Sequence, residues 1–188
     1  MAFYLQFDGT SSIVTIDIAP VNLSWSLELK LNANSTPDGG GVHRPFGGNS
    51  GSRCFVFDNG TRIFLSMEGG SSGDWTGLSF NIDDTILFTR SSTTLELFIN
   101  TVSQGTKTIT TAAFSVVTLG LSAGSRSAIA LEYLSFVDNT NSAISRYYDS
   151  TASGGTGLIL PDTTANASDG TLSGFTGTTN SWWVSFGG

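Results

Sequence analysis

The sequence has little of what stabilises or targets many small proteins. Its 188 residues include one cysteine, Cys54, so no disulfide can form within the chain and a disulfide-rich scaffold is excluded. No apolar run approaches the roughly 20 residues of a membrane-spanning helix, so membrane insertion is not expected. The first residues lack the basic and apolar regions of a secretory signal. A chain of this length can bury a full core without covalent cross-links.

Charged residues are also scarce, at 12% of the chain, with 15 acidic against 8 basic residues and a net charge of −7. A nucleic-acid partner would require clustered Lys and Arg to neutralise its phosphates, so this balance argues against nucleic-acid binding. The acidic residues are scattered, as on an ordinary solvated surface. The 23 glycines and many Ser, Thr and Asn residues are typical of extracellular or virion all-β proteins.

Alternation of apolar and polar residues recurs along the chain and predicts β-strands. The clearest case is 25–31, where Trp25 and three leucines alternate with polar residues. Asn59-Gly60 predicts a tight hairpin, because both central residues of that turn need positive φ. The predicted strands are 3–7, 13–18, 25–31, 54–57, 62–68, 76–82, 85–89, 95–100, 116–121, 127–138 and 182–186.

These short strands predict an all-β fold, a two-sheet antiparallel jelly-roll sandwich. We expect a single domain over 1–188, with a body at 1–150 and an extended C-terminal tail at 151–188. The tail ends in adjacent tryptophans, Trp182 and Trp183, which would be a liability in water. The tail is therefore predicted to dock onto the body, with one Trp inward and one outward.

One segment, 139–149, breaks the alternation. Ile144, Tyr147 and Tyr148 fall at helical spacing, and an Asn or Ser before them would cap a helix. We expect at most one short helix there, of one or two turns.

The run LELFINTVSQGT, residues 95–106, resembles the L-Y-V-N-G-x-x-x-G hairpin of laminin-G-like, concanavalin A-like domains. Thr101 stands where that family usually has Gly. Because a β-branched residue resists positive φ, the turn is expected to be longer or of another type. Further resemblances follow in family order at YLQFDGTSSIVTI, WSLELKL, VVTLGLSAGSRSAIALEYLSFVD and NTNSAISRYYD.

The tail carries a family motif in an unusual place. DTTANASDGTLSGF, residues 162–175, resembles D-S-S-G-N-x-N-x-G-T-L, which in most relatives precedes the F-D-G strand. Since a jelly roll brings its termini together, we hypothesise a permuted order. The strand at 182–186 would then pair beside the strand at 3–7.

The sequence offers little for catalysis. Glucanases of the concanavalin A-like fold carry Glu-x-Asp-x-x-Glu on one strand, with two carboxylates close together. None of the four glutamates here has an Asp two residues on, and the single histidine, His43, supports no catalytic relay. We assign no catalytic residue and expect no enzymatic activity.

The resemblance also implies calcium, which such domains often hold through loop carboxylates and carbonyls. Asp162, Asn166 and Asp169 form one candidate set, and Asp83-Asp84 another. Asp and Asn are equally the usual residues of turns, where they cap their own backbone. We favour the turn interpretation, so no metal or other cofactor is assigned.

A sugar-binding site requires an exposed aromatic face beside groups that hydrogen-bond hydroxyls. GDWTG offers Trp75 and Asp74, although a Trp that covers a hairpin is the alternative. The Gly-rich loop at 34–52 and the residue after it offer further polar groups, although His43 is equally an ordinary loop residue. The candidate carbohydrate-binding residues are Trp75, Asp74, His43, Arg44, Asn49 and Arg53.

The resemblance implies a function as a non-enzymatic bacteriophage virion protein, because small stand-alone domains of this family are frequent among phage genes. It would decorate the capsid or form part of a tail or fibre. Its partners would be other virion proteins or copies of itself, for example as a trimer, together with cell-surface glycans. The alternative is a soluble carbohydrate-binding module or lectin. The predicted location is the virion or, in the alternative, the extracellular space.

Overall fold

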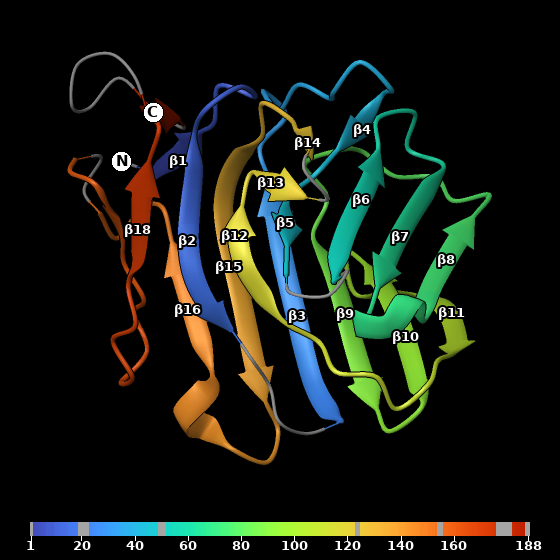
Figure 1. Ribbon diagram of the computed structural model, residues 1–188. Coiled ribbons are helices and arrows are strands. Elements are labelled where there is room, and N and C mark those ends of the chain that lie inside the picture. Colours follow the sequence, from blue (N-terminus) through green and yellow to red (C-terminus); the bar gives the residue numbers. More distant parts are fainter. Residues whose placement is uncertain are drawn as a thin grey trace.

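Two antiparallel β-sheets face each other in the computed structural model of the chain (Figure 1). The structure describes residues 2–18, 23–48, 52–122, 125–153, 156–175 and 182–186. Within these ranges the helical structure consists of two short 3₁₀ turns, η2 (Glu68–Gly70) and η3 (Ser142–Ile144). The predicted all-β, two-sheet jelly-roll sandwich is therefore confirmed.

Sheet A contains the first and the last strand of the chain, which lie next to each other at one edge. Along its main path the order is β11 (Val102–Thr108), β10 (Thr94–Ile99), β9 (Ile86–Ser91), β3 (Ser24–Leu31), β15 (Ala130–Asp138), β1 (Ala2–Gln6) and β19 (Trp183–Phe186), and β16 (Arg146–Asp149) also pairs with β15.

Sheet B forms the second layer. Its order is β17 (Ile159–Leu160), β18 (Gly170–Ser173), β2 (Ile13–Ile18), β12 (Val116–Leu119), β5 (Phe46–Gly47), β6 (Arg53–Phe57), β7 (Arg62–Ser66) and β8 (Ser72–Thr76), with β4 (Val42–His43) paired to β6; β13 (Leu121–Ser122) and β14 (Ser125–Arg126) form a separate ribbon.

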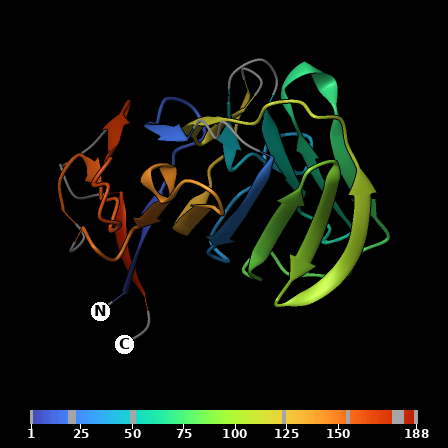
Figure 2. The same ribbon diagram turned by 90° about the horizontal axis from the view of Figure 1, so that it is seen from below.

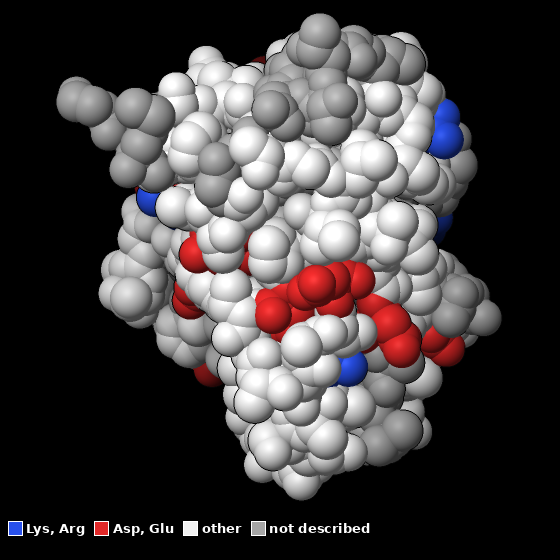
Figure 3. All heavy atoms as spheres, turned by 90° about the vertical axis from the view of Figure 1, so that its left-hand side faces the viewer, with Lys and Arg blue, Asp and Glu red and all other residues white. Residues whose placement is uncertain are grey.

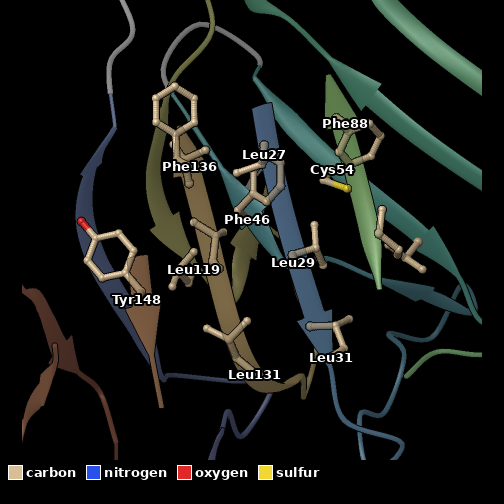
Figure 4. Packing of buried hydrophobic residues seen from close by; sticks show 14 of the residues in the cluster. Leu27, Leu29, Leu31, Phe46, Cys54, Phe88, Leu119, Leu131, Phe136 and Tyr148 are labelled. Carbon is tan, nitrogen blue, oxygen red and sulfur yellow. The ribbon is translucent and has the colours of Figure 1, made fainter. Parts of the chain in front are cut away.

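The core lies between the two sheets and follows the alternation of the sequence. Along β3 every second residue, from Trp25 to Leu31, is buried. Side chains of both sheets meet there, including Leu29 of β3 and Phe46 of β5 (Figure 4). Each such fully buried side chain stabilises the fold by about 1.5–3 kcal/mol relative to exposure. The period of two therefore decides which face of each strand is left for solvent and ligands.

The tail contributes a strand to each layer. β18 pairs with β2 in sheet B, and β19 pairs with β1 in sheet A. The expected pairing of the strand at 182–186 with the first strand is thus present, and the two strands lie side by side in both views (Figures 1 and 2). The expected split of the two tryptophans is wrong: Trp182 and Trp183 are both buried, and the Trp183 Nε1 donates to the Gly157 carbonyl.

The hairpin between β10 and β11 differs from expectation. Ile99 pairs with Val102, so Asn100 and Thr101 form a tight two-residue turn, with φ of 47° and 71°. Thr101 adopts positive φ despite its branched side chain. Asn100 fixes the turn, because its Oδ1 accepts from the Thr85 backbone N–H. The glycine further on, Gly105, has φ of 90° where the register of β10 and β11 shifts.

The predicted helix at 139–149 shrinks to η3, capped by the Asn141 side chain, which accepts from the Ala143 N–H. Tyr147 and Tyr148 belong instead to β16, because that edge strand completes sheet A beside β15. The Asn59-Gly60 turn is present, but only Gly60 has positive φ.

One strand prediction was displaced, and one predicted loop contains strands. Residues 77–82, predicted as part of a strand, form a loop; the strand β8 lies just before it at Ser72–Thr76. The Gly-rich loop at 34–52 contains the short strands β4 and β5. Within the described residues, no helix is long and apolar enough to cross a membrane.

Candidate functional site

The outer face of β6 and β7 carries a hollow. Along β6 the inward residues Cys54 and Val56 are fully buried, so the residues between them face outward. β7 alternates in the same way, with Ile63 and Leu65 inward. The outward residues line a hollow of ≈ 210 Å³, here called the β6–β7 hollow: Arg53, Phe55, Phe57, Arg62 and Phe64.

Aromatic rings line this hollow. Phe55 and Phe64 are direct cross-strand partners, and their rings stack at 5.6 Å with an interplanar angle of 21°. Both side chains are only half-buried, unlike the phenylalanines of the core. Half-buried rings on the solvent side of a sheet provide an apolar surface that a ligand can cover.

Guanidinium groups surround the rings. Arg44 lies 4.5 Å from the Phe55 ring centre, and Arg53 lies 5.4 Å from the same centre. Arg62 lies 4.8 Å from the ring centre of Phe57. These distances fall within the range of cation–π attraction, which holds each cation beside an aromatic face.

Carboxylates hold two of these arginines. Arg62 makes a bidentate pair with Asp74, Nε to Oδ1 at 2.9 Å and Nη2 to Oδ2 at 2.8 Å, and these bonds raise the pKa of Arg62. Arg44 Nε lies 2.6 Å from Asp38 Oδ2. Burial alone would raise the pKa of Asp38, but hydrogen bonds from Arg44 and from backbone N–H groups lower it overall.

Arg53 has no carboxylate partner among the described residues. Its Nε is buried and has no hydrogen-bond partner there either. The hollow therefore combines two neutralised arginines with one guanidinium that retains donor capacity.

The assignment of Trp75 as an exposed sugar platform is wrong. On β8 the alternation turns Asp74 outward and Trp75 inward, where only 2% of Trp75 is exposed. Gly73, on the same inner face, leaves room for the indole: a Cβ there would lie 2.4 Å from the Trp75 ring. The Trp75 Nε1 donates to the Gly105 carbonyl at 3.0 Å, which ties β8 of sheet B to β11 of sheet A.

His43 is also buried, as the pairing of β4 with β6 turns it away from solvent. Burial lowers its pKa, against the opposing effect of Asp58, whose Oδ1 lies 3.1 Å from His43 Nε2. His43 Nδ1 has no partner among the described residues. His43 supports the strand beneath the hollow rather than presenting a binding group.

The remaining predicted residues have different outcomes. Arg44, Arg53 and Asp74 gather at the β6–β7 hollow, while Asn49 lies outside the described residues. The residues that the sequence analysis missed share one signal, the outward positions of the alternating runs RCFVF and RIFLS: Phe55, Phe57, Arg62 and Phe64.

The predicted calcium candidates act as turn residues. Asp162 accepts hydrogen bonds from the backbone N–H groups of Tyr147, Thr164 and Ser168. Asp84 accepts from the Asn81 N–H. Acidic side chains do gather in a band on the side of the molecule that carries β18 (Figure 3). Among the described residues, however, no three His, Cys, Asp or Glu side chains are grouped to hold a metal ion.

Each glutamate is held by a neutral hydrogen-bond donor of its own. The donors are Tyr133 to Glu28, Ser115 to Glu68, Ser103 to Glu96 and Asn32 to Glu132. Cys54 is fully buried, and burial raises the pKa of its thiol, so the reactive thiolate is disfavoured.

Comparison with known proteins identifies the fold only. No protein-family model and no curated protein sequence matches the chain. A protein from Bacteroides ovatus, provisionally described as carbohydrate-binding, has a TM-score of 0.66 and 13% identity; the alignment covers 98% of this chain and 62% of that one. A heptameric SAP-like pentraxin from Limulus polyphemus has a TM-score of 0.54 and 12% identity, over 72% and 75% of the two chains.

Sheep galectin-11, solved with glycerol, aligns over 72% of this chain and 96% of its own at 13% identity, but its TM-score of 0.30 carries no argument. The likeness to the other two is one of fold, an antiparallel β-sandwich. This chain spans less than two thirds of the Bacteroides protein.

Proposed function

We propose that the protein binds carbohydrate without chemically changing it, and that the β6–β7 hollow is the binding site. The observation that carries this proposal is the stacked pair Phe55 and Phe64 on the solvent side of sheet B, with guanidinium groups around it. A pyranose has an apolar face of C–H groups and a rim of hydroxyls. The rings suit the face, and the arginines suit the rim.

The acidic neighbours of the arginines add acceptors to the site. Asp74 and Asp38 hold Arg62 and Arg44 in fixed positions, so these guanidinium groups are ordered before a ligand arrives. A preorganised site loses less side-chain entropy on binding. The description of the Bacteroides structure as carbohydrate-binding agrees with this proposal, within the limits of a shared fold.

The test uses an array of neutral and acidic oligosaccharides, followed by titration calorimetry with the best binder. Phe55→Thr and Phe64→Thr should each weaken binding about 10-fold or more, because each removes half of the stacked surface. Threonine suits a strand, so the fold should survive. Phe98→Thr is the matched control, a half-buried phenylalanine on the outer face of β10 in sheet A.

Three results would decide the question. Loss of binding in the two β6–β7 variants with normal binding in Phe98→Thr supports the hollow. Equal binding by all variants moves the site elsewhere. Absence of any bound glycan overturns the carbohydrate proposal itself.

The virion location, self-association as a trimer and contact with other virion proteins stay predictions from the family resemblance. The pentraxin neighbour is heptameric, which makes the oligomeric state worth measuring by light scattering. Mass spectrometry of purified phage particles tests the location. Carbohydrate binding is compatible with either a virion or an extracellular setting.

A further inference from the structure

The charges at the β6–β7 hollow do not cancel. Arg62 is neutralised by Asp74, and Arg44 by Asp38. Arg53 is left with no acidic partner among the described residues, although the protein as a whole carries a net charge of −7. An acidic protein that keeps an uncompensated guanidinium beside two stacked rings has a locally positive site.

The donor capacity of Arg53 is also incomplete. Its Nε is shielded from solvent and has no acceptor in the described part of the chain. Leaving a buried donor unsatisfied is unfavourable, and more so for a charged group. A bound anion that accepts from another N–H of the guanidinium would offset this cost through a charge-assisted hydrogen bond. The missing partner is therefore an acceptor, and one with negative charge would also balance the site.

The shape of the group narrows the choice of acceptor. A guanidinium is planar and offers parallel N–H donors, which match the two oxygens of a carboxylate. The Arg53 group lies 5.4 Å from the Phe55 ring centre, so one ligand can touch the ring and the cation together. A sugar that stacks on Phe55 would need to carry its anionic group on the substituent of the pyranose that points toward Arg53.

We propose that the β6–β7 hollow selects sugars that carry a carboxylate, such as uronic or sialic acid residues, and that Arg53 reads that carboxylate. This rests on the proposed carbohydrate binding and specifies its ligand class. The pyranose covers Phe55 and Phe64, and the carboxylate accepts from Arg53. Asp38 and Asp74 occupy the other two guanidinium groups, so Arg53 alone sets the charge preference.

The experiment compares each acidic oligosaccharide with its carboxyl-reduced counterpart, in which the carboxylate is replaced by a hydroxymethyl group. Probes are galacturonate and glucuronate oligosaccharides and sialyl-terminated glycans. The unaltered protein should bind the acid form of its best ligand about 10- to 100-fold more tightly than the reduced form, as expected for a charge-assisted hydrogen bond. Raising the salt concentration should reduce this ratio.

Three variants locate the preference. Arg53→Gln should bring the acid-to-reduced affinity ratio close to one while leaving the reduced form bound. Arg53→Lys should restore part of the ratio, because it keeps the charge and loses the planar fork. Lys30→Gln is the matched control: it removes the same charge from β3 in sheet A, where Lys30 pairs with Glu132, and should leave the ratio unchanged.

The outcomes separate this inference from the proposed function. If both ligand forms bind alike and binding still depends on Phe55 and Phe64, the carboxylate preference is overturned and carbohydrate binding stands. If Arg53→Gln keeps the full preference, Arg53 is not the reader and the inference fails. If neither form of any probe binds, both proposals fail.

Discussion

Arg90 and Arg53 place the same guanidinium group in two different settings. Arg90 faces inward from β9, is 2% exposed and lies 6.0 Å from the Trp25 ring centre. Its nitrogens donate to the carbonyls of Ser92, Thr110 and Ala112. Arg53 faces outward from β6, and its Nε has no partner among the described residues.

The difference in hydrogen bonding distinguishes an arginine that supports the fold from one that is free to contact a ligand. A buried cation without a carboxylate is tolerated at Arg90 because three carbonyls satisfy its donors, although burial still lowers its pKa. Those carbonyls include two on the segment that leads from sheet A to sheet B, so Arg90 fixes that crossing. Arg53 makes no comparable set of hydrogen bonds among the described residues, which leaves it available to a ligand.

The largest effect is expected for Arg90→Ala, which should lower the free energy of unfolding by about 3 kcal/mol through lost packing and unpaired carbonyls. Urea unfolding followed by tryptophan fluorescence measures it. Arg90→Met keeps most of the stem and removes the donors, so it separates the two contributions. If Arg90→Met is as stable as the unaltered protein, the hydrogen bonds add no net stability and the contrast with Arg53 weakens.

Trp75→Phe extends the comparison to a second buried donor. It removes the N–H that binds the Gly105 carbonyl and should cost about 1 kcal/mol more than the control Trp25→Phe. Trp25 is the matched case, because its indole nitrogen is buried without a partner among the described residues. Glycan binding by Trp75→Phe should be unchanged. A loss of binding with normal stability would return Trp75 to the site.

His43 gives an effect that depends on pH. Burial lowers its pKa, so the unfolded chain binds a proton more readily than the folded protein. The contribution of His43 to the free energy of unfolding should therefore be complete above the pKa of His43 in the unfolded chain, about 6.5. It should fall as the pH drops below that value, by at most about 1.4 kcal/mol per pH unit. Asp38 and Asp162, whose pKa values are lowered, act the same way only in more acidic solution.

Unfolding midpoints between pH 5 and 7.5 test this dependence. His43 is the single histidine of the sequence, so no other side chain ordinarily titrates in that window. His43→Gln keeps a donor for Asp58 and should flatten the profile. A slope that persists in His43→Gln would assign the dependence to another group.

The sandwich was predictable from sequence because alternation reports directly on burial. In β3 every second side chain is buried, and the pattern of the sequence shows it. Alternation did not predict β11, which only the hairpin resemblance implied, because this edge strand has no residue in the core. The position of β8 was predicted wrongly because Gly73 has no side chain and so gives no sign of alternation. Gly73 faces inward to leave room for the indole of Trp75.

The site was only partly predictable, for a related reason. The Gly-rich loop and the GDWTG run drew attention to Arg44, Arg53 and Asp74, which lie at the β6–β7 hollow, but pairing across strands decides which groups meet. Phe55 and Phe64 become neighbours only through the register of β6 and β7. The alternation in the sequence indicates that these residues face outward, but it does not indicate which carboxylates pair with Arg44 and Arg62. Trp75 drew attention as the largest aromatic, although its size favours burial.

The smallest expected effect is the most informative about Arg53. Arg53→Gln should change the free energy of unfolding by less than about 0.5 kcal/mol, because no hydrogen bond of its Nε is lost. Arg62→Gln serves as the counterpart on β7, and it should cost up to about 1 kcal/mol, since it breaks the bidentate pair with Asp74. Urea unfolding of both variants gives the comparison. A large destabilisation by Arg53→Gln would mean that the group supports the fold as Arg90 does, and its role toward a ligand would then lose its physical basis.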